Sequence, residues 1–200
     1  MAMLWFWILS VLALTEGIDR TKLWTVPKPM NGLNPQGLLG HWFVQYRISP
    51  HSWPGSDELT DYEINLTHAG KNTMMMTLTM RKDVCNTIHA KMYIKPGGVM
   101  TLTDPIGNAF SGLVVIPKVY YDSFCIFYIC TRMNVQGKKC DDALVSIETR
   151  MPLPNKDVIA RINQALISLW GTTVDQLTPV RRKQSCLAET HMFPPRAKWG

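Results

Sequence analysis

The chain has 200 residues, of which 46% are hydrophobic and 18% are charged, and its formal net charge is +6. This length and composition predict one domain with a substantial buried core and short tails. The Lys and Arg residues are scattered, and the densest group, RRK at 181–183, lies near the C-terminal tail. The positive charge therefore indicates solubility and a weak general attraction to anions, and it argues against a nucleic-acid partner.

The first residues have the pattern of a secretion signal. The apolar run MLWFWILSVLAL is followed by TEG, which places the small residues Thr15 and Gly17 where signal peptidase requires them. We therefore expect residues 1–17 to be a signal peptide and the protein to be secreted and extracellular. No later stretch has 18 apolar residues in a row, so no stable membrane insertion is expected.

After an amino-terminal extension at 18–33, the sequence alternates between apolar and polar residues. In 41–49 the apolar positions are Trp42, Val44, Tyr46 and Ile48. A period of two residues is typical of a strand with two different faces. The same alternation returns in 73–81 and in 88–94.

Turn-forming sequences separate these runs: HSWPGS, HAGKN, KPGG, DPIGN and VQGKK. Further strands are expected at 58–68, 98–103, 110–119, 121–132 and 141–150, with a bend or bulge at Pro117. About eight short strands with hairpin-length links predict an antiparallel sandwich or an up-and-down barrel.

The spacing of the apolar residues changes after residue 150. Pro154 and Asn155 mark the start of a helix and Gly171 its end, and apolar residues recur at helical spacing at Val158, Ile159, Ile162, Leu166 and Leu169. This single amphipathic helix must pack against the outside of the sheet. The strand at 124–130 fits such packing because both its faces are apolar. Phe124, Ile126 and Tyr128 lie on one face, and Cys125, Phe127 and Ile129 on the other.

The chain has five cysteines: Cys85, Cys125, Cys130, Cys140 and Cys186. In an oxidising compartment this odd number allows at most two internal disulfides and one free or intermolecular thiol. Neither the cysteines nor the histidines have the spacing of a metal site, so no metal and no other cofactor is expected. The sequon Asn65-Leu66-Thr67 makes Asn65 a candidate for glycosylation.

Three segments of the chain are NPQGLLGHW, VYYDSFCIFYIC and ETRMPLPNKDVIARINQAL. They resemble the three motifs of the lipocalins and occur in the same order as in that family. The sequence VDQLTPVRRKQSC then continues as the family does. The resemblance covers residues 34–186 and is greatest to the apolipoprotein D-like secreted lipocalins, although Val119 and Tyr120 stand where the family usually has Thr and Asp. It implies an all-β fold, an eight-stranded antiparallel up-and-down barrel with one carboxy-terminal α-helix packed outside, followed by a flexible tail at 187–200.

The resemblance also gives roles to particular residues. It implies that Gly40 and Trp42 close the base of the barrel and that Arg150 lies across the indole of Trp42. It pairs Cys85 with Cys186.

The second disulfide has two interpretations. Cys130 and Cys140 flank TRMNVQGKK and can face each other across a hairpin. Apolipoprotein D-like proteins instead bridge the equivalent of Cys130 to an amino-terminal cysteine, which this chain lacks. A hairpin disulfide leaves Cys125 free.

By this resemblance the protein is a carrier of a small hydrophobic ligand, such as a fatty acid derivative, a steroid or a retinoid, held inside the barrel. Methionines among the expected lining can adapt to an irregular apolar guest, or they merely fill a core. Trp53 either covers the ligand or anchors its loop. The candidate ligand-binding residues are Tyr46, Ile48, Trp53, Met74, Met76, Leu78, Met80, Ile88, Met92, Met100, Val114, Phe124, Ile126 and Tyr128.

No buried acidic pair or cluster of basic residues stands out in this set, which favours a neutral apolar molecule. A carboxylate at the open end can still meet Arg47, Lys91 or Lys95. Two alternatives belong to other classes. A prostanoid-type isomerase would use Cys125, but no cation lies near this thiol in sequence, so we expect no catalytic residue. A lipocalin with a filled barrel would act by binding a protein, with a cell-surface receptor as its partner.

Overall fold

The computed structural model describes residues 25–48, 58–103, 111–134, 136–137 and 139–186. A short helix, α2 (Pro35–Leu38), precedes the strands, and a long helix, α3 (Lys156–Trp170), follows the first eight of them. The strands are β1 (Gly40–Ile48), β2 (Thr60–Gly70), β3 (Thr73–Arg81), β4 (Cys85–Ile94), β5 (Val99–Thr103), β6 (Gly112–Tyr120), β7 (Phe124–Met133), β8 (Cys140–Thr149) and β9 (Thr178–Pro179). A 3₁₀ turn, η2 (Val174–Gln176), lies between α3 and β9.

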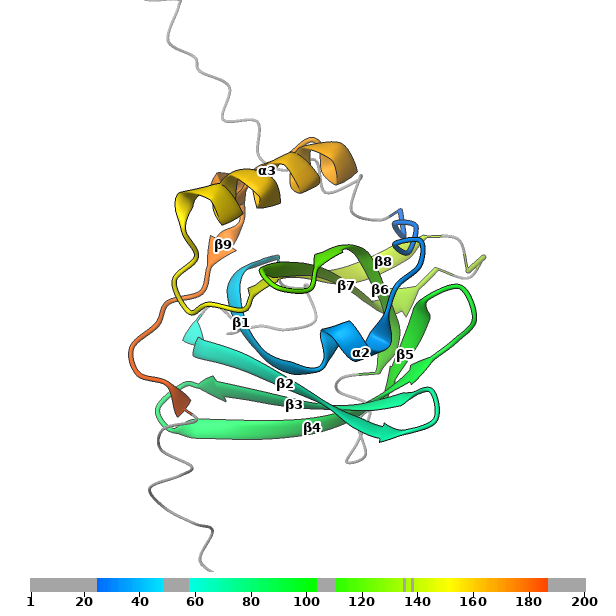
Figure 1. Ribbon diagram of the computed structural model, residues 1–200, viewed down its shortest axis with the longest axis horizontal. Helices are drawn as coiled ribbons and strands as arrows, with labels where there is room; N and C mark the ends of the chain where they lie inside the picture. The colour runs from blue at the N-terminus through cyan, green and yellow to red at the C-terminus, as the bar shows by residue number, and fades with distance from the viewer. Residues whose placement is uncertain (1–24, 49–57, 104–110, 135, 138, 187–200) are drawn as a thin grey trace, which may run out of the picture.

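Strands β1 to β8 form a closed antiparallel barrel, shown in Figure 1. Each strand from β2 to β8 pairs with the next, and β1 closes the barrel because it pairs with both β8 and β2. The predicted eight-stranded barrel with an external carboxy-terminal helix is therefore confirmed. β9 is an addition that the sequence did not predict, and it pairs with β1 at Tyr46 and Arg47. None of the described helices is long and apolar enough to cross a membrane.

Two apolar clusters lie on opposite sides of the barrel wall. The inner cluster is inside the barrel and comprises Leu38, Trp42, Val44, Tyr62, Ile64, Leu66, Met74, Met76, Leu78, Met80, Ala90, Met92, Met100, Leu102, Val114, Ile116, Val119, Cys125, Phe127 and Val180. The outer cluster lies between the wall and α3 and comprises Val115, Phe124, Ile126, Tyr128, Cys130, Cys140, Val145, Ile147, Ile162, Ala165, Leu166, Trp170, Val174 and Leu177. Figure 1 shows α3 across the outside of the barrel, on the side of β7 and β8.

A β-bulge in β1 overturns one of the predictions. Between the pairs Val44↔Glu148 and Tyr46↔Ile147, β1 advances two residues while β8 advances one, so Gln45 is the extra residue. The residues after the bulge change faces. Tyr46 and Ile48 pack against the outer cluster, so their expected place inside the barrel is wrong.

The assignment of faces on β7 is also corrected. Phe124, Ile126 and Tyr128 were expected inside the barrel, but they belong to the outer cluster, and Cys125 and Phe127 point inward instead. The cause is α3, whose apolar face must be covered by the three larger outward side chains. Pro117 lies at a register shift in β6, where a bend or bulge was expected.

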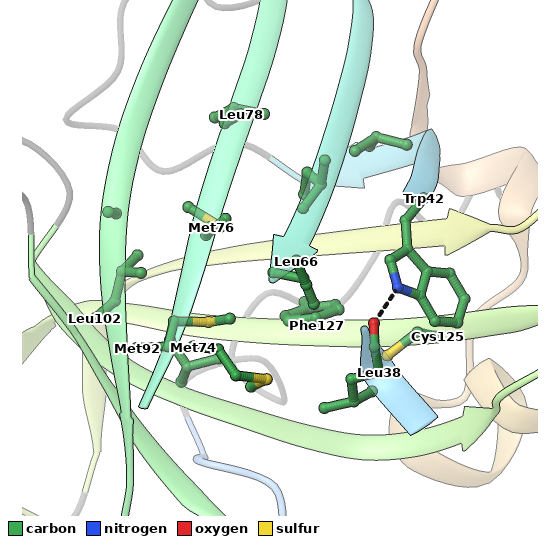
Figure 2. Packing of buried hydrophobic residues seen from close by; sticks show 14 of the residues in the cluster. Leu38, Trp42, Leu66, Met74, Met76, Leu78, Met92, Leu102, Cys125 and Phe127 are labelled. Carbon is green, nitrogen blue, oxygen red and sulfur yellow. Dashed lines mark hydrogen bonds between the residues drawn. The ribbon is translucent and has the colours of Figure 1, made fainter. Parts of the chain in front are cut away.

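Trp42 and α2 form the floor at one end of the barrel. The Trp42 side chain is fully buried, and its Nε1 donates to the Leu38 carbonyl at 2.7 Å, as Figure 2 shows. The Arg150 guanidinium lies 3.6 Å from the centre of the indole, as the lipocalin resemblance implies. It donates to the carbonyls of Gly37, Leu39, His41 and Tyr121. One cation thus joins three segments of the chain at the floor.

Helix caps and disulfides hold the carboxy-terminal part. The Asn155 side chain accepts from the Val158 amide, and Gly171 ends α3 in the left-handed conformation. Both expected disulfides are present: Cys85–Cys186 ties the end of the described chain to β4, and Cys130–Cys140 bridges β7 and β8. Cys125 is the free cysteine, and its side chain is buried.

Candidate ligand-binding cavity

The barrel interior contains a cavity of about 40 Å³. This is room for about three water molecules, which is far less than a steroid or a retinoid needs. Residues of five strands form its wall: Val44, Arg47, Tyr62, Ile64, Met76, Leu78, Phe127, Ile129, Leu144, Ser146 and Glu148.

Two of the predicted ligand-binding residues, Met76 and Leu78, line this cavity. Others are in the barrel interior but fill it rather than line the cavity: Met74, Met80, Ile88, Met92, Met100 and Val114. In Figure 2, Met74 and Met92 lie close together below Met76, and they are direct register partners on β3 and β4. The methionines therefore occupy the part of the barrel on the side of β3, β4 and β5.

Three further candidates do not contribute to the described cavity. Trp53 lies outside the described residues. Lys91 and Lys95 are exposed. Lys91 points away from the interior because its neighbours Ala90 and Met92 point into it. The expectation that these two lysines can meet a carboxylate at the open end is therefore not supported by their placement.

A polar wall runs along β1 and β8, and Arg47 alone among its residues was a candidate from the sequence. Arg47, Ser146 and Glu148 all line the cavity and are at most 5% exposed. Arg47 is the register partner of Ser146, and Val44 is that of Glu148, so the three polar residues share one face. Arg47 was a candidate to meet a carboxylate and does line the cavity, whereas Ser146 and Glu148 were not among the candidate residues.

Arg47 and Tyr62 are joined across the cavity wall. The Arg47 Nη1 atom donates to the Tyr62 hydroxyl, and the guanidinium carbon lies 4.7 Å from the centre of the Tyr62 ring. Both side chains are buried, at 3% and 5% exposure. A buried guanidinium needs such contacts because its desolvation is costly.

Glu148 is fully buried, and its two carboxyl oxygens have different surroundings. Oε1 accepts from the Ser146 hydroxyl at 2.9 Å, whereas Oε2 has no hydrogen-bond partner among the described residues. Burial raises the pKa of Glu148 from its ordinary value of 4.5 to about 8, against the opposing effects of Ser146 and Arg150. At neutral pH the carboxyl group is therefore protonated and can donate as well as accept.

Cys125 lies beside Glu148, because the two are register partners on β7 and β8. Burial raises the pKa of the Cys125 thiol well above its ordinary value, and Glu148 adds to this effect. The thiolate needed for nucleophilic chemistry is thus disfavoured.

The barrel and its external helix also occur in solved structures. The allergen Per a 4 from cockroaches matches with a TM-score of 0.61 at 16% identity, over 79% of this chain and 94% of that one. Lobster apocrustacyanin A1 matches with a TM-score of 0.60 at 18% identity, over 86% of this chain and 91% of that one. Insecticyanin from the tobacco hornworm Manduca sexta matches with a TM-score of 0.62 at 12% identity, over 80% of this chain and 92% of that one. These proteins are lipocalins.

This chain has the lipocalin fold. The TM-scores of 0.60–0.62 show the shared barrel, while at identities of 12–18% the likeness to the apolipoprotein D-like members stays a prediction. No protein-family model matches the sequence, and no curated protein sequence matches it.

Two other predictions concern sites on this lipocalin barrel. Asn65 is half-buried on β2, between its register partners His41 and Thr77, and its glycosylation stays a prediction. In the described part of the chain, no group of three or more His, Cys, Asp or Glu side chains is placed to hold a metal ion.

Proposed function

We propose that this protein is a secreted carrier that holds a small hydrophobic molecule inside its barrel. The observation that supports this most directly is the cavity, whose lining is mostly apolar. The barrel around this cavity is closed at one end by α2 and Trp42. Apolar walls with a few polar groups are typical of small-molecule sites. The apolar part of the lining is Val44, Ile64, Met76, Leu78, Phe127, Ile129 and Leu144.

The methionines make a larger ligand site available. All five that were predicted in the interior are buried there: Met74, Met76, Met80, Met92 and Met100. Methionine is unbranched and changes rotamer at low cost, so these side chains can move aside and enlarge the cavity when a ligand enters. A steroid-sized or retinoid-sized guest binds only with such a rearrangement.

Secretion and the absence of an enzymatic role belong to the same proposal. Two disulfides and the leader-like residues 1–17 support an oxidising extracellular location. The burial and raised pKa of Cys125 argue against a thiol-dependent isomerase. If Cys125 were nonetheless catalytic, Cys125→Ala would abolish turnover and leave binding intact.

The test is a titration of the protein with retinol, a fatty acid and a steroid, followed by the quenching of tryptophan fluorescence. We expect saturation at about one ligand per chain. Met76→Ala enlarges the cavity and should change the dissociation constant. Ile126→Ala is the matched control, because Ile126 is fully buried in the outer cluster. This substitution should lower the stability of the protein without changing the dissociation constant of the ligand.

A filled-barrel lipocalin that binds a protein receptor is the second candidate, and the small volume of the cavity favours it. Native mass spectrometry of protein purified from its source separates the two functions. A retained small molecule supports the carrier. No retained molecule, together with no quenching across the panel, would reject the carrier and leave the receptor-binding function.

A further inference from the structure

The unpartnered oxygen of Glu148 is the least explained feature of the cavity. The side chain is fully buried and lines the cavity, and its Oε2 atom finds no hydrogen-bond partner in the described part of the protein. A buried polar atom without a partner destabilises the folded state. The Ser146 hydroxyl fixes Oε1 and thereby leaves Oε2 as the atom that can meet a guest.

The charges around the cavity restrict what that guest can be. Arg47 lines the same cavity from β1, Arg150 acts on Glu148 from the end of β8, and Cys125 and Tyr62 are the titratable groups on β7 and β2. An ammonium group would share the cavity with the Arg47 guanidinium. A carboxylate could lie against Glu148 only while Glu148 keeps its proton. A neutral group is subject to neither of these two restrictions.

A hydroxyl group suits Glu148 in both protonation states. It can accept from a protonated carboxyl group and donate to an ionised one. Its size also fits, because a cavity of about 40 Å³ holds an alcohol group and a few carbon atoms before any side chain moves. The remaining apolar part of the molecule then lies toward the apolar lining residues, such as Met76 and Leu78 on β3.

We propose that the ligand is a neutral amphiphilic alcohol whose hydroxyl group hydrogen-bonds to Glu148 Oε2, while its apolar body packs against β2, β3 and β7. This inference rests on the proposed carrier function and names the chemical class of its ligand. Glu148 thus selects the functional group, Ser146 positions the carboxyl group, and the methionines adapt to the rest of the molecule.

The test compares decan-1-ol with 1-chlorodecane, which has a similar size but cannot replace the hydroxyl as a donor. Dissociation constants are measured by calorimetry for the wild type, Glu148→Met and Glu148→Gln. Using the ratio of the two constants within each protein cancels the different hydration of the probes. We expect Glu148→Met to shift this ratio against the alcohol by roughly tenfold. Glu148→Gln should keep the wild-type ratio, because an amide also donates and accepts.

The control variant is Leu78→Met on the apolar wall, which should change both constants by the same factor. An independent readout needs no substitution: the infrared carbonyl band of the protonated Glu148 side chain should shift with decan-1-ol and stay in place with 1-chlorodecane. Thermal unfolding of each variant verifies that it is folded.

The outcomes separate this inference from the carrier function. If both probes bind the wild type but Glu148→Met leaves their ratio unchanged, or the infrared band does not move, the alcohol assignment is overturned and the carrier stands. Decylamine and decanoic acid test for an ionic ligand. If either loses more affinity than decan-1-ol between the wild type and Glu148→Met, the site is assigned to an ion instead. If no probe of the series binds the wild type, the alcohol assignment fails, and the panel of retinol, a fatty acid and a steroid then decides whether the carrier function stands.

Discussion

The buried carboxyl group of Glu148 makes the stability of this protein depend on pH. Its pKa is about 8 in the folded state and close to the ordinary value of 4.5 once the chain unfolds. Between these two values the folded protein retains a proton that the unfolded chain releases. The stabilisation by this retained proton is complete below pH 4.5. It decreases by about 1.4 kcal/mol per pH unit between pH 4.5 and pH 8, and it is lost once the pH has risen through 8.

Glu148→Gln removes this dependence, because an amide does not titrate in this range. The free energy of unfolding of the variant, relative to the wild type, should therefore rise by about 4 kcal/mol between pH 5 and pH 8. Guanidinium chloride unfolding, followed by tryptophan fluorescence at both pH values, measures the difference. Taking the difference between variant and wild type cancels the other titrating groups.

A matched control is Glu58→Gln, since Glu58 is exposed and pairs with Lys82 on the surface. This variant should show no comparable rise in relative stability at pH 8. A Glu148→Gln variant whose relative stability is the same at pH 5 and pH 8 would refute the reasoning, because the carboxyl group would then titrate alike in the folded and unfolded states.

Three further predictions concern the floor, the disulfide and the free thiol. Arg150→Lys should lower the free energy of unfolding by about 3 kcal/mol in denaturant titrations, since an ammonium group cannot bond to four carbonyls and cover the indole; wild-type stability would contradict this. Replacing both Cys85 and Cys186 with serine opens a loop with a sequence separation of 101 and should cost about 5 kcal/mol in the same assay; a loss below about 1 kcal/mol would argue against it. Iodoacetamide should label Cys125 only after unfolding, as detected by mass spectrometry, and rapid labelling of the native protein would show that the thiol is accessible.

The strands and the helix were largely predictable because their signals are local, whereas the choice of a barrel over a sandwich rested on the lipocalin resemblance. A period of two residues, interrupted by turn sequences, indicated the number and order of the strands of the barrel. The helix was bounded by Asn155 and Gly171, whose side-chain cap and left-handed conformation are set within one turn of α3. β9 escaped prediction because it has two residues, which is too short for any period to appear.

The site was less predictable because the face to which a residue belongs is not a local property. On β8, Ser146 and Glu148 alternate with Val145 and Ile147, and the usual inference would turn the polar pair outward. α3 covers the outer face of this strand, so the apolar pair packs beneath the helix and the polar pair faces the cavity. The same ambiguity affects β7, which is apolar on both faces.

The bulge at Gln45 has a consequence for how the specificity of such a barrel can change. Before the bulge, β1 contributes Trp42 and Val44 to the interior; after it, β1 turns Arg47 inward and Tyr46 toward α3. The same residues in a strand without the bulge would turn the Tyr46 phenol toward the ligand wall and the Arg47 guanidinium away from it, whereas deleting Gln45 would restore regular pairing and keep Arg47 inward. The presence of a bulge is thus an independent determinant of cavity chemistry, alongside the identity of the residues that face the cavity.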